Sequence, residues 1–311
     1  MKTKIFSVLI VLMTTVAVQA QQIAVVSSNG TTTIHRTLEA AITAATANSV
    51  IYLPGGGFSI SDEVKITNKI TIIGIGHKVR GENADGYTTI TGNLYFNEGS
   101  SGSAVMGCYI TGNIYIGDDN KTVNDILVRY CNLNQVRVQN STCTGTVVNQ
   151  NYIRGISYFS GSEATCTNNV AYSFSHMTNG VISYNVITGA VSSINSSSIT
   201  DNVIYNPGNS IGEDCLIAGN MCLGSWGDDP ISISGSSWSV VFVKYKGISP
   251  FSDFHFIEDY QQYEGSCGIY AGSGFSDGQL PPAPFIVEKS IPEQTDASGN
   301  LNIRIRVKAG E

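Results

Sequence analysis

The chain has 311 residues and a net charge of −7, and only 13% of its side chains are charged. This charged fraction is about half that of an average soluble protein, which favours long stacked strands over a conventional helical domain. The negative charge argues against a nucleic-acid partner, because phosphate binding depends on Lys and Arg. The negative charge also argues against binding of an acidic polysaccharide by electrostatic attraction alone.

The first 20 residues have the pattern of a secretory signal peptide. Lys2 and Lys4 precede an apolar run from Ile5 to Met13, and Val18-Gln19-Ala20 supplies a cleavage site. The run is too short to cross a bilayer comfortably, which takes about 20 residues, and no later segment is apolar enough to be a membrane span. We therefore expect a mature protein without a membrane span that is secreted, periplasmic or on the cell surface.

Residues 37–45 predict a short amphipathic helix near the start of the mature chain. Leu38, Ala41, Ile42 and Ala45 fall on one helical face. Strand-like sequence follows at residues 50–53, 64–66 and 70–75, with a Pro-Gly-rich turn in between. We expect the helix to cap the first coil of a repetitive fold, since the open end of such a fold exposes its core.

An Asn recurs through the central chain at intervals of 16 to 20 residues, and an apolar residue follows it each time. A period this short excludes two-helix repeats, which need about 33 residues, and predicts coils of short strands. Asn suits tight turns because it tolerates the left-handed backbone region. Its amides could also bond from coil to coil as an asparagine ladder. The predicted ladder comprises Asn93, Asn113, Asn132, Asn151, Asn169, Asn185, Asn202 and Asn220.

Two repeats, Tyr184-Asn185-Val186-Ile187 and Asp201-Asn202-Val203-Ile204, resemble the parallel β-helix repeats of the pectate-lyase-like superfamily. The resemblance covers about residues 23 to 245. It implies an all-β fold: a right-handed, single-stranded parallel β-helix solenoid with an N-terminal capping helix and a small C-terminal β cap. Residues 21–245 would form the solenoid. The superfamily includes lyases, hydrolases, esterases and non-catalytic adhesins, so the resemblance implies no single activity and no catalytic residue is carried over.

Residues 246–311 differ in character from the repeats and are expected to form a C-terminal cap or tail. Aromatic residues cluster from Phe251 to Tyr263, and residues 301–307 alternate apolar and polar as a half-buried strand does. We favour a cap over the last coil. A small docking or sorting element is the alternative.

Two groups of charged residues are candidates for binding. Arg129, Arg137 and Arg154 fall on three nearby coils and could line one face, where they would bind a uronate carboxylate through paired hydrogen bonds. The alternative is that they only solubilise the surface. His176 is the sole histidine within the repeats, and the sequence names no partner for it.

The second group is acidic and lies on consecutive coils, which are about 4.8 Å apart. Trp226 stands beside it and could stack on a sugar ring. The four carboxylates could bind Ca²⁺, hold an acid/base pair, or be ordinary solvated turn residues. The candidate acidic site consists of Glu213, Asp214, Asp228 and Asp229.

Two functions remain. The first is a non-catalytic surface protein that binds a glycan or takes part in adhesion, and the second is a polysaccharide lyase or glycoside hydrolase that acts on an extended glycan. The sparse supply of basic and paired acidic residues favours the first. The sequence leaves open whether the protein is an enzyme, and it establishes no cofactor beyond the Ca²⁺ hypothesis.

Overall fold

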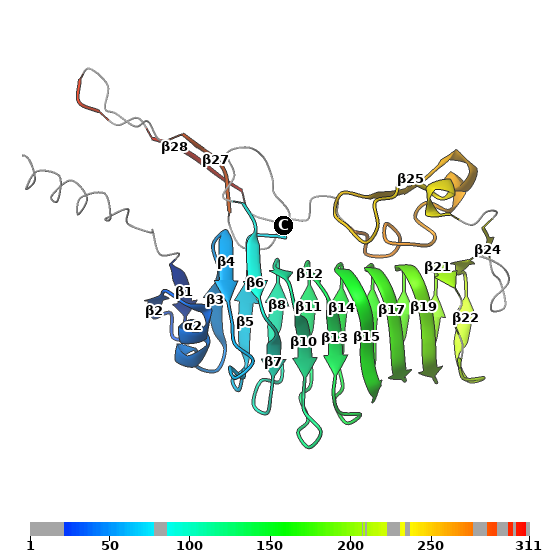
Figure 1. Cartoon of the computed structure of the whole chain (residues 1–311), viewed down its shortest axis with the longest axis horizontal. Helices are drawn as coiled ribbons and strands as arrows, with labels where there is room; N and C mark the ends of the chain where they lie inside the picture. The colour runs from blue at the N-terminus through cyan, green and yellow to red at the C-terminus, as the bar shows by residue number, and fades with distance from the viewer. Residues whose placement is uncertain are drawn as a thin grey trace, which may run out of the picture.

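We analysed a computed structural model, which describes residues 22–77, 86–206, 208, 210–222, 231–233, 237–275, 285–290, 298–300 and 303–308. Over these residues the chain winds into a parallel β-solenoid of about nine turns (Figure 1). The prediction of an all-β parallel solenoid is therefore confirmed.

The first face of the solenoid is an 11-stranded sheet to which each coil adds one strand. Strand β1 pairs antiparallel with β2 and β3, and every later pair is parallel. In spatial order the strands are β2 (Thr32–His35), β1 (Ile23–Val26), β3 (Ser49–Tyr52), β5 (Ile70–Ile73), β8 (Ala104–Met106), β11 (Leu127–Arg129), β14 (Thr146–Asn149), β16 (Ala164–Thr167), β18 (Val181–Ser183), β20 (Ser198–Thr200) and β22 (Leu216–Ala218).

The second and third faces are separate in the early coils and continuous in the later ones. Strand β15 pairs with both β12 and β13, and a register shift between Ile153 and Ile156 marks the bend. The second face consists of β4 (Gly56–Ser59), β6 (Thr88–Thr91), β9 (Tyr109–Ile110), β12 (Asn132–Leu133), β15 (Tyr152–Ser162), β17 (Val170–Thr178), β19 (Val186–Asn195), β21 (Val203–Asn206), β23 (Met221–Cys222) and β24 (Ile231–Ser232). The third face of the early coils consists of β7 (Leu94–Phe96), β10 (Asn113–Ile116) and β13 (Gln135–Val138).

The interior of the coils is filled by stacked apolar side chains. Successive residues of a strand point to opposite faces, so alternate positions of each strand enter this core. Its largest members include Phe96, Phe159 and Phe174, which have no exposed surface. The low charge of the sequence follows, because each coil devotes much of its length to this interior.

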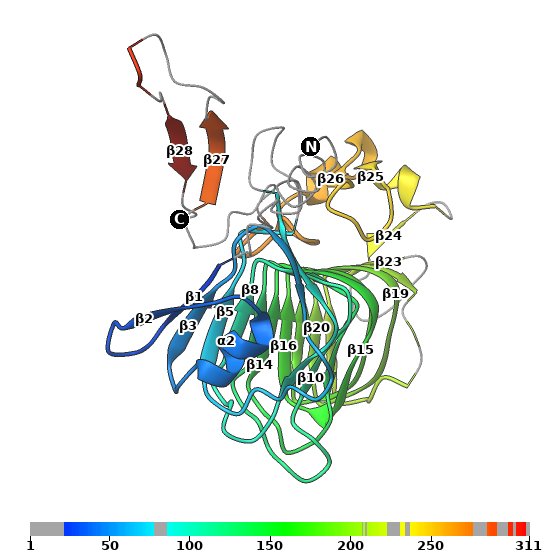
Figure 2. The same ribbon diagram turned by 60° about the vertical axis from the view of Figure 1, so that its left-hand side comes forward.

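The N-terminal end carries the helix expected from the sequence. Helix α2 (Leu38–Ala44) lies across the first coil (Figure 2), and the Thr37 hydroxyl caps it by accepting a hydrogen bond from the Ala40 N–H at 3.2 Å. The expected apolar face is buried against the solenoid core. No helix in the described ranges has the length and apolar composition needed to cross a membrane.

Residues 237–275, here called the covering segment, lie along one side of the solenoid and run back over the later coils (Figure 1). They contain η1 (Trp238–Val240), β25 (Phe242–Lys244), β26 (Asp253–Phe256) and η2 (Glu258–Tyr263). The Asn168 amide donates to the carbonyls of Ile269 and Ala271 at 2.9 and 2.8 Å. For these residues, the expected cap over the last coil is replaced by a lateral cover.

The reason for this placement is an apolar stripe on the outside of the later coils. One side chain per coil, directly after a repeated Asn, points away from the solenoid core and packs under the covering segment. Phe242, Phe256 and Phe275 are among the aromatic residues that bury it. The stripe consists of Tyr152, Val170, Val186, Val203 and Met221.

The last described elements are β27 (Phe285–Ser290) and β28 (Arg304–Lys308), which pair antiparallel. The strand expected near residues 301–307 is thus present. Its expected burial is not, because Ile303, Ile305 and Val307 are each more than half exposed.

Candidate functional site

Five of the repeated asparagines form a continuous buried ladder. The side-chain amides of Asn151, Asn169, Asn185 and Asn202 each donate to the Oδ1 atom of the next Asn in the row at 2.9 to 3.0 Å, and Asn220 ends the row. Each of these amides also donates to two backbone carbonyls, so all of its polar atoms are paired. The ladder is structural, because its members are buried.

The ladder does not extend to the other three asparagines, contrary to the sequence prediction. The strand register aligns Cys131 with Asn151 and Cys108 with Cys131. The Cys131 N–H donates to the Asn151 Oδ1 at 2.9 Å, and its thiol donates to the Arg129 carbonyl at 3.3 Å, as a ladder amide would. Burial raises the pKa of the Cys131 thiol to about 12, so it stays protonated and remains a donor.

The remaining three asparagines lie elsewhere. Asn93 and Asn113 are at the start of the third face, where the Asn113 N–H donates to the Asn93 Oδ1 at 2.8 Å. Asn132 occupies the outward position next to the ladder, and its buried Oδ1 has no hydrogen-bond partner among the described residues. Sequence spacing alone did not distinguish these three asparagines from the ladder members. The early coils have a separate third strand, whereas in the later coils the second and third strands are continuous.

The left-handed residue of each ladder turn is the one before the Asn. Gln150, Asn168, Tyr184 and Asp201 have φ angles of 57°, 53°, 57° and 57°. The Asn itself is therefore selected for its amide and not for a tolerance of positive φ, which corrects the turn argument made from sequence.

The three arginines do not share a face. Arg129 lies on β11 of the first face and donates twice to the Gln150 Oε1, at 3.2 and 3.0 Å. Arg137 lies on β13 of the third face and is exposed. Arg154 lies on β15 of the second face and donates to the Tyr109 hydroxyl at 2.8 Å and the Ile110 carbonyl at 3.2 Å. Intervals of 8 and 17 residues between them do not match the coil length at these positions.

Half of the predicted acidic site lies within the described residues. Asp214 accepts a hydrogen bond from the Ser196 N–H at 3.0 Å and another from the Ser196 hydroxyl, and these bonds lower the pKa of its carboxyl. Asp214 thus ties its turn to that of the preceding coil, beside the exposed Glu213. Asp228, Asp229 and Trp226 lie outside the described residues, so the convergence of four carboxylates stays a prediction.

The described residues contain no cluster of three or more His, Cys, Asp or Glu side chains that could hold a metal ion. His176 is exposed, and its ring packs against that of Tyr158 with the centroids 4.3 Å apart. The Ca²⁺ hypothesis therefore concerns only the predicted acidic site, half of which lies outside the described residues.

A groove lies between the second face and the covering segment. Its cavity volume is about 590 Å³. The solenoid wall is a row of outward side chains, because the backbone pairs Ile153–Ala171, Ala171–Ile187 and Ile187–Ile204 bring the following residues into register. The groove is lined by Arg154, Tyr172, Thr188 and Tyr205 from the solenoid and by Ser237, Trp238, Tyr245 and Ile248 from the covering segment.

Two aromatic side chains of the solenoid wall remain accessible, whereas Trp238 of the covering segment is buried. Tyr172 is 45% exposed and Tyr205 is 37% exposed. The Tyr205 ring packs against Trp238 with the centroids 5.5 Å apart. Gly189 leaves room for Tyr172, since a Cβ there would come within 2.6 Å of the Tyr172 carbonyl and 3.3 Å of its ring.

Tyr245 joins the two walls. Its hydroxyl hydrogen-bonds to Thr188, and burial raises the pKa of its phenol. At one end of the row, Arg154 is held over the Tyr109 ring at 5.0 Å. The groove therefore presents ring faces suited to apolar sugar surfaces, together with a fixed cation and hydroxyls suited to hydrogen bonding.

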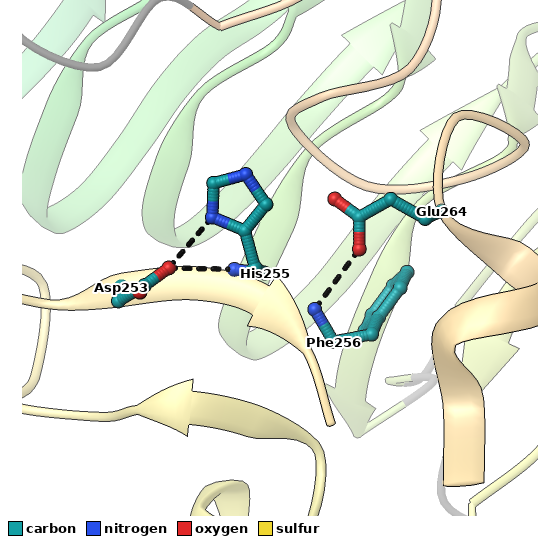
Figure 3. A network of polar contacts seen from close by, with 4 residues as sticks. All are labelled: Asp253, His255, Phe256 and Glu264. Carbon is teal, nitrogen blue, oxygen red and sulfur yellow. Dashed lines mark hydrogen bonds and ion pairs between the residues drawn. The ribbon is translucent and has the colours of Figure 1, made fainter. Parts of the chain in front are cut away.

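A second polar arrangement lies in the covering segment (Figure 3). The His255 Nδ1 is 2.7 Å from the Asp253 Oδ1, and the Phe256 N–H donates to the Glu264 Oε2 at 3.0 Å. The His255 ring also stacks on Tyr270 with the centroids 4.0 Å apart. The contacts of Phe256 with Glu264 and of His255 with Tyr270 join β26 to the residues that follow η2, and we interpret them as stabilising the covering segment internally.

The groove residues Tyr172, Tyr205, Trp238 and Tyr245 were not predicted from the sequence. A signal exists for the first wall, because Arg154, Tyr172, Thr188 and Tyr205 each stand three residues after a ladder Asn. For the second wall no periodic signal exists, since Trp238 and Tyr245 lie outside the repeats.

Comparison with known proteins adds no family. No protein-family model matches the chain, and no curated protein and no solved structure matches it.

Proposed function

We propose that this protein is a secreted, non-catalytic β-solenoid that binds a linear glycan in the groove between its second face and its covering segment. The observation that carries the proposal is the exposed pair Tyr172 and Tyr205, aligned on the solenoid wall opposite Trp238 and Tyr245. Four consecutive coils at about 4.8 Å each give the row an extended shape parallel to the solenoid axis, which suits several sugar units in succession.

The composition of the groove supports binding more than hydrolysis. Its described lining residues include aromatic, hydroxyl and guanidinium groups but no carboxylate or imidazole. Hydrolysis of a glycosidic bond commonly uses two carboxylates on either side of the bond. Polysaccharide cleavage at the acidic site of Glu213, Asp214, Asp228 and Asp229 is the alternative function inferred from the sequence.

Export and family membership are parts of the same proposal. The signal-like sequence of residues 1–20 supports export, and those residues lie outside the described ranges. The repeats and the parallel solenoid support a place in the pectate-lyase-like superfamily. Fold alone does not define an activity, so the groove carries the functional argument.

The test is a binding titration with neutral linear oligosaccharides of three to six sugars, followed by calorimetry. We expect Tyr172→Ala and Tyr205→Ala each to weaken binding by about tenfold or more, since loss of an aromatic contact removes about 1 kcal/mol or more beyond its buried area. Tyr52→Ala is the matched control, because Tyr52 is equally exposed but lies on β3 of the first face.

Two outcomes would count against the proposal. One is that none of the neutral oligosaccharides binds, and the other is that Tyr52→Ala weakens binding as much as the groove variants do. Release of shorter products during the titration would instead favour the enzymatic alternative.

A further inference from the structure

The N-terminal edge of the first face is open in the solenoid. Strand β2 is the first strand of the 11-stranded sheet, and within the described part of the chain no strand pairs with its outer side. Helix α2 covers the end of the apolar core, but β2 lies at the margin of the molecule (Figure 2). A free strand edge presents unpaired backbone groups that can pair with another chain. The edge of β2 is therefore a candidate interaction surface.

The register of the hairpin formed by β1 and β2 shows which backbone groups face the open edge. The Ser27 N–H donates to the Thr31 carbonyl at 2.9 Å. Hydrogen-bonded pairs alternate with unbonded pairs along an antiparallel ladder, so Thr33, two residues further on, bonds to β1. The N–H and C=O groups of its neighbours Thr32 and Ile34 consequently point away from β1, toward the open edge.

This edge is complementary to itself. When two β2 strands meet antiparallel about a twofold axis at Thr33, Thr32 of each copy lies opposite Ile34 of the other. Both residues of each such pair face outward, so they can exchange both N–H···O=C bonds, as a hydrogen-bonded pair of an antiparallel sheet does. The first faces of the two copies then join into one continuous sheet.

The side chains of the edge also suit association with an identical copy. Residues 27–35 contain no Asp, Glu, Lys or Arg, so pairing with a copy brings no like charges together, whereas protected edges commonly carry a charged side chain. Ile34 is 55% exposed on the side of the sheet that faces away from the core, in line with Ala24 and Tyr52. In a pair of β2 strands the two Ile34 side chains flank the axis and bury apolar surface between the copies.

The exposed strand near the C-terminus is less suited to self-association. In β28 the apolar residues Ile305 and Val307 are more than half exposed, but Arg304 and Arg306 alternate with them. An antiparallel pair of β28 strands about Ile305 would place Arg304 of one copy opposite Arg306 of the other. Like charges directly opposite one another destabilise a sheet, so a second copy fits β2 and not β28.

We propose that β2 is a dimerisation strand, which binds the β2 strand of a second copy of this chain antiparallel about Thr33. The contact uses the β2 edge of both copies, so association stops at the dimer and does not continue into a filament. Because β2 has only four residues, the interface falls in the small class below about 1,200 Å², and we expect a reversible dimer with a micromolar Kd. The surface is on the first face, away from the groove, and is independent of the proposed function.

The experiment is sedimentation velocity of the purified protein across the micromolar concentration range. We expect the native protein to shift from monomer to dimer and to form nothing larger. Ile34→Lys should weaken dimerisation by about tenfold or more, because two ammonium groups then meet beside the axis. Ile34→Pro should weaken it as well, because it removes an N–H that faces the open edge and leaves the bonds to β1 in place.

Two matched controls locate the interface. Val243→Lys alters an equally exposed apolar residue, on β25 of the covering segment, and should leave dimerisation unchanged. Leu216→Lys alters another, on β22 at the opposite end of the same sheet, and should also have no effect. Circular dichroism of each variant verifies that lost dimerisation does not reflect a lost fold.

A cysteine at the axis tests the register itself. Thr33 of one copy lies opposite Thr33 of the other as an unbonded pair, with Cα atoms about 4.5 Å apart, which is within the range of a disulfide. Thr33→Cys should therefore form a covalent dimer when glutathione disulfide oxidises the two thiols and is itself reduced. The Cys215→Ser background is used because Cys215 is only partly buried. Thr43→Cys, exposed on α2, is the control and should stay monomeric under the same conditions.

A native protein that stays monomeric throughout the concentration range would overturn the proposal, as would equal dimerisation of the native protein and Ile34→Lys. Growth beyond the dimer, or its loss in Leu216→Lys alone, would overturn the twofold arrangement in favour of end-to-end stacking. Covalent dimers that form equally from Thr33→Cys and Thr43→Cys would contradict the register.

Discussion

The corner between the first and second faces of the solenoid is built differently in the early and the later coils. In the later coils the inward corner position is Asn, fully hydrogen-bonded from Asn151 to Asn220, and the next residue outward is apolar and covered. In the early coils the inward position is Cys108 or Cys131, and the outward positions are Tyr109 and Asn132.

The difference shows that the asparagine ladder is found in the coils whose corner is buried by the covering segment. A covered corner is remote from water on both sides, and unpaired backbone groups there are costly. The asparagine amides pair with carbonyls at each turn of the covered coils. The same cover supplies one wall of the groove, so the feature that stabilises the later coils also creates the proposed binding site.

The largest expected loss of stability comes from a substitution in the covering segment. Phe242 is 1% exposed and packs against Trp238, Phe254 and Phe256. Phe242→Ala should cost about 3 to 5 kcal/mol, as truncation of a core Phe does. Hydrogen exchange should quicken across residues 237–275 and the late strands β17 to β21, and not in β3, β5 and β8. Uniform quickening across all coils would show that the cover is not a separable layer.

A smaller effect should distinguish true ladder members from the other asparagines. Asn185→Leu removes three donated hydrogen bonds and the acceptor of the Asn169 amide. We expect a loss of about 2 to 3 kcal/mol in the free energy of unfolding, because buried partners are left unpaired. Asn132→Leu is the control, since the Asn132 Oδ1 has no hydrogen-bond partner among the described residues, and it should change stability much less. Equal losses in urea unfolding would contradict the division between the two groups.

The cysteines of the early corner provide a chemical test without a change in sequence. Burial raises the pKa of Cys131 to about 12 and that of Cys108 well above its ordinary value. Almost no thiolate is present at pH 8, so both should resist iodoacetamide in the folded protein. Cys215, which is only partly buried, should react first, as followed by peptide mass spectrometry. Rapid labelling of Cys131 under native conditions would contradict its placement in the corner.

The smallest expected effect concerns the acid stability of the later turns. The pKa of Asp214 is lowered in the folded state by its bonds to Ser196. A lowered pKa contributes stability above the unfolded value, near 3.9 for Asp, and that contribution disappears as pH falls through the folded pKa. Asp214→Asn should therefore lower the melting temperature slightly at pH 6 and converge with the native protein in strong acid. A constant difference down to strong acid would indicate another role for Asp214.

The sequence predicted the solenoid because its evidence was periodic. Asn151 through Asn220 recur with the coil, and an apolar residue such as Val170 or Val186 follows each of them. The same pattern could not show that Val170 faces outward, since an outward apolar residue is explained only by the cover, which lies outside the repeats. Nor could spacing separate Asn113 from Asn132, because a 19-residue interval there leads to a different face.

The candidate site was less predictable for the same reason. Tyr172 and Tyr205 occupy a fixed place after the ladder Asn, so their alignment follows once the register is known. Trp238 and Tyr245 reach the groove through the tertiary path of the covering segment, which no local pattern encodes. The predicted arginine face was wrong because Arg129, Arg137 and Arg154 lie on three different faces of the solenoid.

Hydrogen exchange in the presence of a bound neutral oligosaccharide tests the central claim most directly. If the groove binds glycan between solenoid and cover, exchange should slow in two separated segments, around Tyr172 to Tyr205 and around Trp238 to Ile248. The first face around β3 should be unchanged. Slowed exchange that leaves both groove walls unaffected, or that appears only on another face, would contradict the account.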